Sequence, residues 1–188
     1  MKRIIVVSNR LPFTVVKENE GWKFTESVGG LATGLSTYLQ SFSLHPSLDL
    51  EYVWVGWPGR TIPEESREEI KSRSLADYRA YPVFLSEDAV EKFYQGFCNK
   101  TIWPLFHYFP IYTRYDPEYW LQYENVNRVF ADTLAEMLRP DDLVWIHDYH
   151  LMLLPKYLRE RFPNNSIEIE QDCVGRSAPA VTPPRHPG

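Results

Sequence analysis

The chain has 188 residues, of which 44% are hydrophobic, and its 20 basic and 25 acidic side chains give a formal net charge of -5. This length suits one domain, and the mild acidity argues against binding to phosphate backbones, so we expect no nucleic acid partner. No apolar run reaches the ~20 residues of a membrane span or resembles a secretion signal, so we expect a cytoplasmic protein with no membrane partner.

The first half of the chain alternates predicted strands and helices. Residues 4–7 form an unbroken, β-branched apolar run, which is typical of a strand covered on both faces in a parallel sheet. Residues 13–17 and 22–25 flank a turn sequence and predict a hairpin. From Gly30 onward, apolar residues at helical spacing predict a helix with one buried stripe, formed by Leu31, Leu35, Tyr38, Leu39 and Phe42.

The same alternation continues through the second half. Strands are predicted over residues 52–57, 81–85 and 143–146, and helices over residues 64–73 and 152–162. Ser86 is a candidate N-cap for a helix that ends at about residue 97. Asp116 followed by Pro117 predicts the start of a long helix, whose buried face consists of Val126, Phe130, Leu134 and Met137.

This order of elements predicts an α/β fold with a Rossmann-like parallel sheet. Near the end, Glu168 and Glu170 alternate with isoleucines, and a strand there would place both carboxylates on one face, which a doubly covered sheet could not bury. The proline-rich residues that follow are typical of disorder. We therefore predict a fold that ends at about residue 167 and a disordered tail over residues 168–188.

In a parallel α/β sheet, ligands bind at the carboxyl ends of the strands. The glycines from Gly29 to Gly34 precede a predicted helix, whose N-terminus favours a phosphate or diphosphate. The spacing does not match the dinucleotide fingerprint, and Leu35 stands where an ATP-binding loop requires lysine. The alternative is structural: Gly29 and Gly30 form a tight turn and Gly34 allows close helix packing.

Several side chains near predicted strand ends suit a phosphorylated sugar. Arg10 follows the first strand and could bind a phosphate through its guanidinium, although a surface salt bridge would explain it equally well. Trp57, Tyr94 and Trp103 offer aromatic faces that suit sugar rings, although each taken singly could be a core residue.

Residues 145–150 are the most distinctive segment, because a predicted strand ends directly in polar side chains. Asp148 is the candidate for acid/base work or for accepting hydrogen bonds from sugar hydroxyls. A metal site formed by His147, Asp148 and His150 is a weaker alternative, and His150 could equally be a core residue. The cysteines, Cys98 and Cys173, lack metal-ligand spacing and predict neither a zinc site nor a disulfide framework.

Five segments in order together resemble the N-terminal half of the trehalose-6-phosphate synthases, the retaining enzymes of glycosyltransferase family 20. The matching segments are residues 6–12 (VVSNRLP), 27–35 (SVGGLATGL), 54–59 (WVGWPG), 93–108 (FYQGFCNKTIWPLFHY) and 145–155 (WIHDYHLMLLP). The resemblance implies the N-terminal lobe of a GT-B fold over residues 1–167, with the second lobe missing. Residues 168–188 depart from the family pattern, most simply because of a frameshift or a truncated gene model. It also implies glucosyl transfer from UDP-glucose to glucose 6-phosphate, with no metal or other cofactor.

The resemblance assigns roles to individual residues. Asp148 matches an aspartate that binds the acceptor beside the transferred glucose. Gly30 matches a backbone contact to the UDP-glucose diphosphate. The remaining matches are to the glucose 6-phosphate site, and they are Arg10, Trp57, Tyr94 and Trp103.

Three functions remain open from the sequence. The first is the acceptor-binding lobe of a family 20 synthase with little activity alone, because catalysis needs both lobes to close over the donor. The second is a non-catalytic module that captures glucose 6-phosphate, self-associates, or associates with a full-length synthase. The third is a related GT-B enzyme with another acceptor, such as a glucosylglycerol-phosphate synthase.

Overall fold

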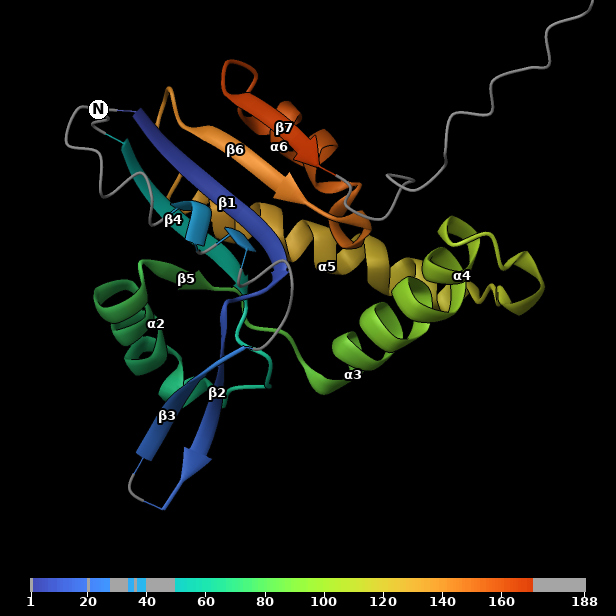
Figure 1. Ribbon diagram of the computed structural model, residues 1–188, viewed down its shortest axis with the longest axis horizontal. Helices are drawn as coiled ribbons and strands as arrows, with labels where there is room; N and C mark the ends of the chain where they lie inside the picture. The colour runs from blue at the N-terminus through green and yellow to red at the C-terminus, as the bar shows by residue number, and fades with distance from the viewer. Residues whose placement is uncertain (1, 20, 28–33, 36, 40–49, 171–188) are drawn as a thin grey trace, which may run out of the picture.

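A five-stranded parallel sheet forms the centre of the molecule (Figure 1). The computed structural model describes residues 2–19, 21–27, 34–35, 37–39 and 50–170. The strand order is β5-β4-β1-β6-β7, and every neighbouring pair is parallel, which confirms the Rossmann-like α/β class. The strands are β1 (Lys2–Arg10), β4 (Leu50–Trp57), β5 (Ala80–Pro82), β6 (Leu143–His147) and β7 (Ser166–Glu170).

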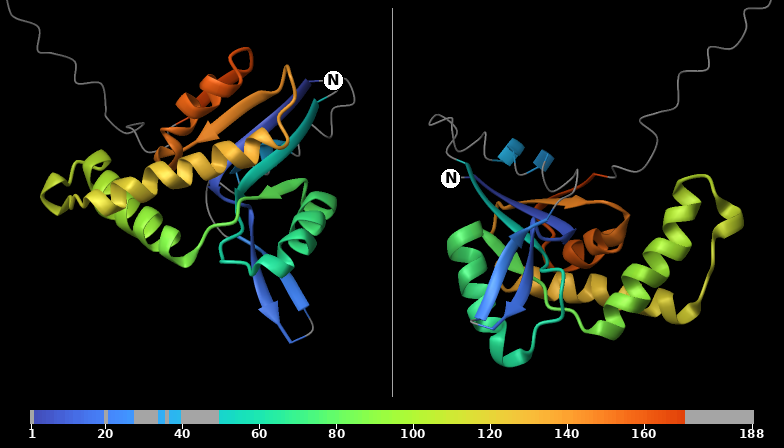
Figure 2. Two further views of the ribbon diagram at one scale, coloured as in Figure 1. Left: turned by 180° about the vertical axis from the view of Figure 1, so that it is seen from behind. Right: turned by 60° about the horizontal axis from the view of Figure 1, so that its bottom comes forward.

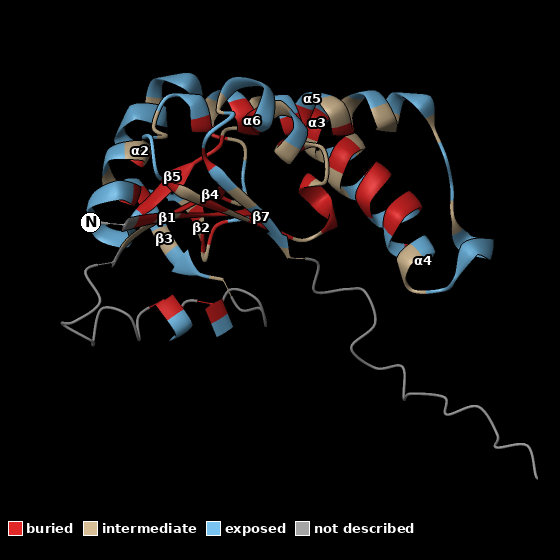
Figure 3. Ribbon diagram, turned by 90° about the horizontal axis from the view of Figure 1, so that it is seen from above, coloured by how far each residue is buried: buried red, intermediate tan, exposed pale blue. Residues whose placement is uncertain are grey.

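Both faces of the central strand are buried, as its unbroken apolar run predicts. Ile5 and Val7 face one hydrophobic core, and Val6 faces the other. The second core also contains Leu35 and Leu39, so the predicted stripe after Gly30 is buried at these two positions, whereas Tyr38 on the same segment is 52% exposed. The burial colours of Figure 3 show β1, β4 and β5 as mostly buried, in red.

Helices pack on the sheet in the predicted order. They are α2 (Glu64–Tyr78), α5 (Pro117–Ala135), the short turn η3 (Tyr149–Leu151) and α6 (Leu154–Arg161). The Asp116 side chain accepts a hydrogen bond of 2.8 Å from the Glu118 backbone N–H, which confirms the predicted helix start. The views in Figure 2 show α5 running along one face of the sheet. None of the described helices is long and apolar enough to cross a membrane.

A helical arm projects from the body of the molecule (Figures 1 and 2). It consists of α3 (Glu87–Ala89), the π-helical η1 (Val90–Ile102) and α4 (Trp103–Phe106), and the turn η2 (Pro110–Tyr112) follows it. Ser86 caps its start, accepting a hydrogen bond of 3.1 Å from the Ala89 N–H, as predicted. The arm continues well beyond the predicted end near residue 97 and packs along α5, where the Phe97 ring lies 5.3 Å from the Trp120 ring.

The predicted hairpin is confirmed, with β2 (Phe13–Glu18) pairing antiparallel with β3 (Gly21–Glu26). β5 is shorter than the predicted strand and ends at Pro82. One further backbone bond, from the Val83 N–H to the Gly56 carbonyl, continues beyond it at 2.8 Å.

The last described strand extends beyond the boundary predicted at residue 167. β7 pairs with β6 as far as Glu170, which lies opposite His147. It is the outermost strand of the described sheet, and Glu168 is exposed there. Two alternating carboxylates are therefore compatible with a strand at this position, because Glu168 is exposed and Glu170 is only partly buried. The rest of the predicted tail, residues 171–188, lies outside the described residues.

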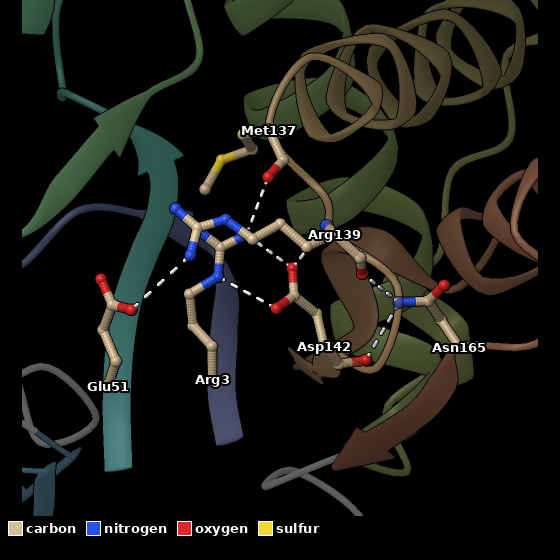
Figure 4. Close-up of polar contacts among 6 residues, drawn as sticks. All are labelled: Arg3, Glu51, Met137, Arg139, Asp142 and Asn165. Atoms are coloured by element: carbon tan, nitrogen blue, oxygen red, sulfur yellow. Dashed lines mark hydrogen bonds and ion pairs between the residues drawn. The ribbon is translucent and has the colours of Figure 1, made fainter. Parts of the chain in front are cut away.

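A buried ion pair joins the start of β1 to the residue that precedes β6 (Figure 4). Arg3 donates to both carboxylate oxygens of Asp142, from Nε at 3.0 Å and from Nη2 at 2.6 Å, and Nη2 also donates to the Met137 carbonyl. The hydrogen bonds to Asp142 raise the pKa of Arg3. The Asn165 amide donates to the carbonyls of Arg139 and Asp142, which ties the chain before β7 to the same network.

Removing one member of this ion pair should destabilise the fold strongly. We expect Asp142→Ala to lower the free energy of unfolding by about 3–5 kcal/mol, because it leaves the buried Arg3 guanidinium unpaired. Urea denaturation followed by circular dichroism measures this loss. The matched control is Glu18→Ala, which breaks the exposed pair with Lys23 and should cost less than about 1 kcal/mol. Equal losses in the two variants would contradict the prediction.

Gly96 allows close contact between the arm and α5. A Cβ at this position would lie 2.8 Å from Cγ of the Tyr119 ring, which is too close for carbon atoms. We expect Gly96→Ala to lower the free energy of unfolding by about 1–3 kcal/mol, as overpacked sites do.

Gly34→Ala is the control for this variant. Among the described residues, an added Cβ at Gly34 would meet no atom within 4 Å. The control should be neutral or stabilising, because alanine favours the helix that Gly34 occupies. Thermal unfolding gives the melting temperatures of both variants. A melting temperature of Gly96→Ala equal to or above that of Gly34→Ala would contradict the prediction.

Candidate functional site

The candidate site lies where the strand order reverses. The chain moves outward from β1 to β4 and β5, and then returns to β6 on the other side of β1. In open parallel sheets, ligands bind outside the carboxyl ends of the strands at this switch point. Arg10 ends β1, Trp57 ends β4 and Asp148 follows β6, so the fold places all three residues at the same edge of the sheet.

Arg10 and Trp57 form one part of this edge. They are register partners on neighbouring strands, and the guanidinium carbon of Arg10 lies 5.5 Å from the centre of the Trp57 ring. Nη2 of Arg10 donates to Thr14 Oγ1 at 3.0 Å. Within the described ranges, no carboxylate forms an ion pair with Arg10, so the salt-bridge alternative is not supported. The exposed guanidinium can therefore receive an anion.

Two further polar groups lie buried on the strands of this edge. Asn9 Oδ1 and Trp57 Nε1 have no hydrogen-bond partner in the described part of the chain. Buried polar atoms in folded proteins are nearly always paired, so unpaired ones commonly await a ligand or water. Of these two groups, Trp57 Nε1 belongs to the ring that lies beside the cation of Arg10.

Asp148 forms the second part of the site, with a strained backbone. Its φ of 73° and ψ of 163° lie in a region that residues other than glycine rarely occupy. Its N–H donates to the Glu170 carbonyl of β7 at 2.7 Å, and its Oδ1 accepts from the Tyr149 N–H at 2.7 Å. Strain of this kind persists only where surrounding contacts enforce it, and it is concentrated at functional sites.

His150 and Tyr94 complete this second part. Nδ1 of His150 lies 3.1 Å from Oδ2 of Asp148. The Tyr94 ring stacks on the His150 ring at 5.6 Å between centres, which brings the arm against the loop after β6. Tyr94 is half-buried, so one part of the ring packs and another reaches solvent.

Two buried side chains, Cys98 and Tyr123, lie close enough to Asp148 to feel its charge. Burial raises the pKa of the Cys98 thiol, and the charge of Asp148 adds to this effect. Burial also raises the pKa of Tyr123, whose hydroxyl donates to the Tyr149 carbonyl at 2.7 Å. Both groups therefore stay protonated. The Cys98 thiol is fully buried. Cys173 lies outside the described residues.

Trp103 occupies a different place, further along the arm. It is 42% exposed, and its ring stacks on His107 at 4.2 Å rather than on Tyr94 or His150. It lines a cleft of about 430 Å³ at the end of the arm, together with Asn99, Lys100, Pro104, Phe109, Tyr112 and Arg114. The described contacts thus form two groups: Arg10 with Trp57, and Tyr94 with His150 and Asp148. None of the described contacts links Trp103 to either group.

Gly30 lies outside the described residues. No group of three histidine, cysteine or acidic side chains within the described ranges could hold a metal ion. Sequence reasoning missed the contact of Thr14 with Arg10 and that of His150 with Asp148. The second lay within the distinctive segment 145–150, but its geometry depends on a backbone conformation that residue types do not reveal.

Comparison with known proteins places this geometry in a family. The family model "Glycosyltransferase family 20" matches residues 2–169, which is most of the chain. The chain belongs to glycosyltransferase family 20. This membership confirms the resemblance found in the sequence, and it makes the chain a glycosyltransferase by family.

Curated relatives of this family 20 chain are UDP-forming α,α-trehalose-phosphate synthases. A synthase of Dictyostelium discoideum is 45% identical over 166 residues, which cover 88% of this chain and 21% of the relative. A synthase of Yarrowia lipolytica is 42% identical, with 88% of this chain and 34% of the relative covered. The chain thus spans between about a fifth and a third of the length of these relatives.

Solved structures of synthases share the fold of the family 20 chain. A Burkholderia xenovorans synthase in complex with glucose-6-phosphate has a TM-score of 0.66 and 27% identity, covering 89% of this chain and 32% of that one. An E. coli protein bound with UDP-2-fluoro glucose has a TM-score of 0.65 and 30% identity, over 89% of this chain and 32% of that one. These matches cover the N-terminal GT-B lobe expected from the sequence.

The backbone strain at Asp148 can be measured with two substitutions. Asp148→Ala and Asp148→Gly both remove the carboxylate contacts, but only glycine tolerates the positive φ without cost. We expect Asp148→Gly to be more stable than Asp148→Ala in this family 20 chain, by about 1 kcal/mol or more. Urea denaturation of the two proteins side by side provides the measurement. A glycine variant that is less stable than the alanine variant would show that the backbone is unstrained.

Proposed function

We propose that this chain is the acceptor-binding lobe of a UDP-forming α,α-trehalose-phosphate synthase. In this proposal it binds glucose 6-phosphate and contributes to glucosyl transfer from UDP-glucose. One observation carries the proposal: in a family 20 chain, the exposed Arg10 beside Trp57 and the strained Asp148 lie at the same edge of the sheet. The ligands bound in the two solved structures, glucose-6-phosphate and UDP-2-fluoro glucose, support the same substrate class.

Each proposed contact follows from the chemistry of the side chain. Arg10 binds the phosphate of the acceptor, because a guanidinium forms two parallel hydrogen bonds with a phosphate. The Trp57 ring, next to that cation, covers a face of the sugar and offers its unpaired N–H as a donor. Asp148 accepts hydrogen bonds from sugar hydroxyls beside the transferred glucose, and Tyr94 and Trp103 line the acceptor site along the arm.

The donor requires more protein than residues 1–167 provide. Gly30 contributes a backbone contact to the diphosphate of UDP-glucose, and basic groups elsewhere in a complete synthase compensate the charge of the departing UDP. No metal is required in this proposal. Because catalysis needs both sides of the donor to be enclosed, the 188-residue chain alone should have little activity. We place it in the cytoplasm, alone or associated with a full-length synthase.

Binding of the acceptor tests the proposal directly. Isothermal calorimetry with the chain should show saturable binding of glucose 6-phosphate. Arg10→Ala should weaken it about tenfold or more, because a charge-assisted contact of ~1.5–3 kcal/mol is lost. Glucose, which lacks the phosphate, should bind Arg10→Ala and the unaltered chain equally. The control Arg128→Ala removes an exposed cation on α5 and should leave the affinity unchanged.

Two outcomes would contradict the proposal. Absence of saturable glucose 6-phosphate binding by the unaltered chain would overturn the assignment of the acceptor site. Rapid release of UDP from UDP-glucose by the purified chain, in the presence of glucose 6-phosphate, would overturn the expected inactivity of the lobe alone.

A further inference from the structure

His150 is buried, yet it lacks the hydrogen bonds that buried histidines normally make. Neither ring nitrogen has an aligned hydrogen-bond partner in the described part of the chain. An unsatisfied buried polar group costs folding free energy, so its presence calls for an explanation. The nearest charge is the Asp148 carboxylate, whose Oδ2 lies 3.1 Å from Nδ1 without lying along the direction of the ring N–H.

The imidazole ring is held between two tyrosines. Tyr149 stacks on it at 4.3 Å between ring centres, with 21° between the planes, and Tyr94 stacks on it at 5.6 Å and 22°. Phe93 contacts the ring edge-on at 6.4 Å. A ring packed in this way cannot tilt without displacing its neighbours, because protein interiors are close-packed. The His150 ring therefore holds a fixed position beside the Asp148 carboxylate.

The Asp148 carboxylate is held from two sides. Its Oδ1 accepts the Tyr149 N–H, and its Oδ2 faces His150. A carboxylate has about four lone-pair positions, so it can accept several hydrogen bonds at once. The backbone at Asp148, with its φ of 73°, gives the side chain a direction that an ordinary strand end would not allow. The orientation of this carboxylate thus depends on the Tyr149 backbone and on the buried His150 ring.

We infer that His150 is a positioning residue, which orients the Asp148 carboxylate toward the hydroxyls of the acceptor sugar. The contact becomes an aligned Nδ1–H to Oδ2 hydrogen bond when the acceptor binds, since such bonds are often long or misaligned before the ligand is present. This inference rests on the proposed function, because it takes Asp148 as a contact of glucose 6-phosphate.

Two substitutions separate positioning from packing. His150→Phe keeps a ring between the tyrosines but removes the N–H, whereas His150→Asn supplies an amide N–H close to the place of Nδ1. Measured by calorimetry on the full chain, His150→Phe should bind glucose 6-phosphate about tenfold more weakly. His150→Asn should recover most of that loss. Phe93→Leu, which alters packing against the same ring, should reduce stability but change affinity by less than about twofold.

A double substitution tests whether His150 acts through Asp148. In the Asp148→Asn background, His150→Phe should cause no further loss of affinity, because the group that it positions has already changed. Equal affinity of His150→Phe and the unaltered chain would overturn this inference alone, as would failure of His150→Asn to rescue binding. Absence of binding by the unaltered chain would overturn the proposed function as well.

Discussion

The pairing of β1 with β6 is the constraint on which the site depends. At one end of the two strands, the buried ion pair between Arg3 and Asp142 fixes their alignment. At the other end, the same alignment brings Arg10 and Asp148 to one edge. A slip of one residue would turn every side chain of β1 to the opposite face of the sheet. The two cores would then be disrupted together with the site, so stability and binding geometry have a common origin.

The sequence predicted the elements whose signals are local. The unbroken run in β1, the hairpin, and the start of α5 at Asp116 each follow from a few neighbouring residues, and all are confirmed. The arm and β7 were harder to predict. The length of the arm depends on packing against α5, where Gly96 admits Tyr119, and β7 depends on lying at the edge of the described sheet, where Glu168 reaches solvent. Both depend on tertiary surroundings, which hydrophobic periodicity does not encode.

The candidate site shows the same division. The ends of parallel strands meet at one edge, so Arg10, Trp57 and Asp148 could be grouped from the sequence once the class of fold was known. The distinction between Tyr94, which stacks on His150, and Trp103, which stacks on His107, could not be made in this way. Tyr94 and Trp103 lie on consecutive helical segments of the arm. Their surroundings differ because the arm projects beyond the body of the molecule.

The backbone bond from the Asp148 N–H to the Glu170 carbonyl has a consequence for dynamics. Edge strands open more readily than central ones, and amide hydrogen exchange reports such local openings. Asp148 follows a central strand, yet its amide is protected by the last residue of β7. Its exchange rate should therefore follow the fraying of the sheet edge rather than the opening of the core. In this fold, the order of Asp148 is linked to a strand at the edge of the described sheet.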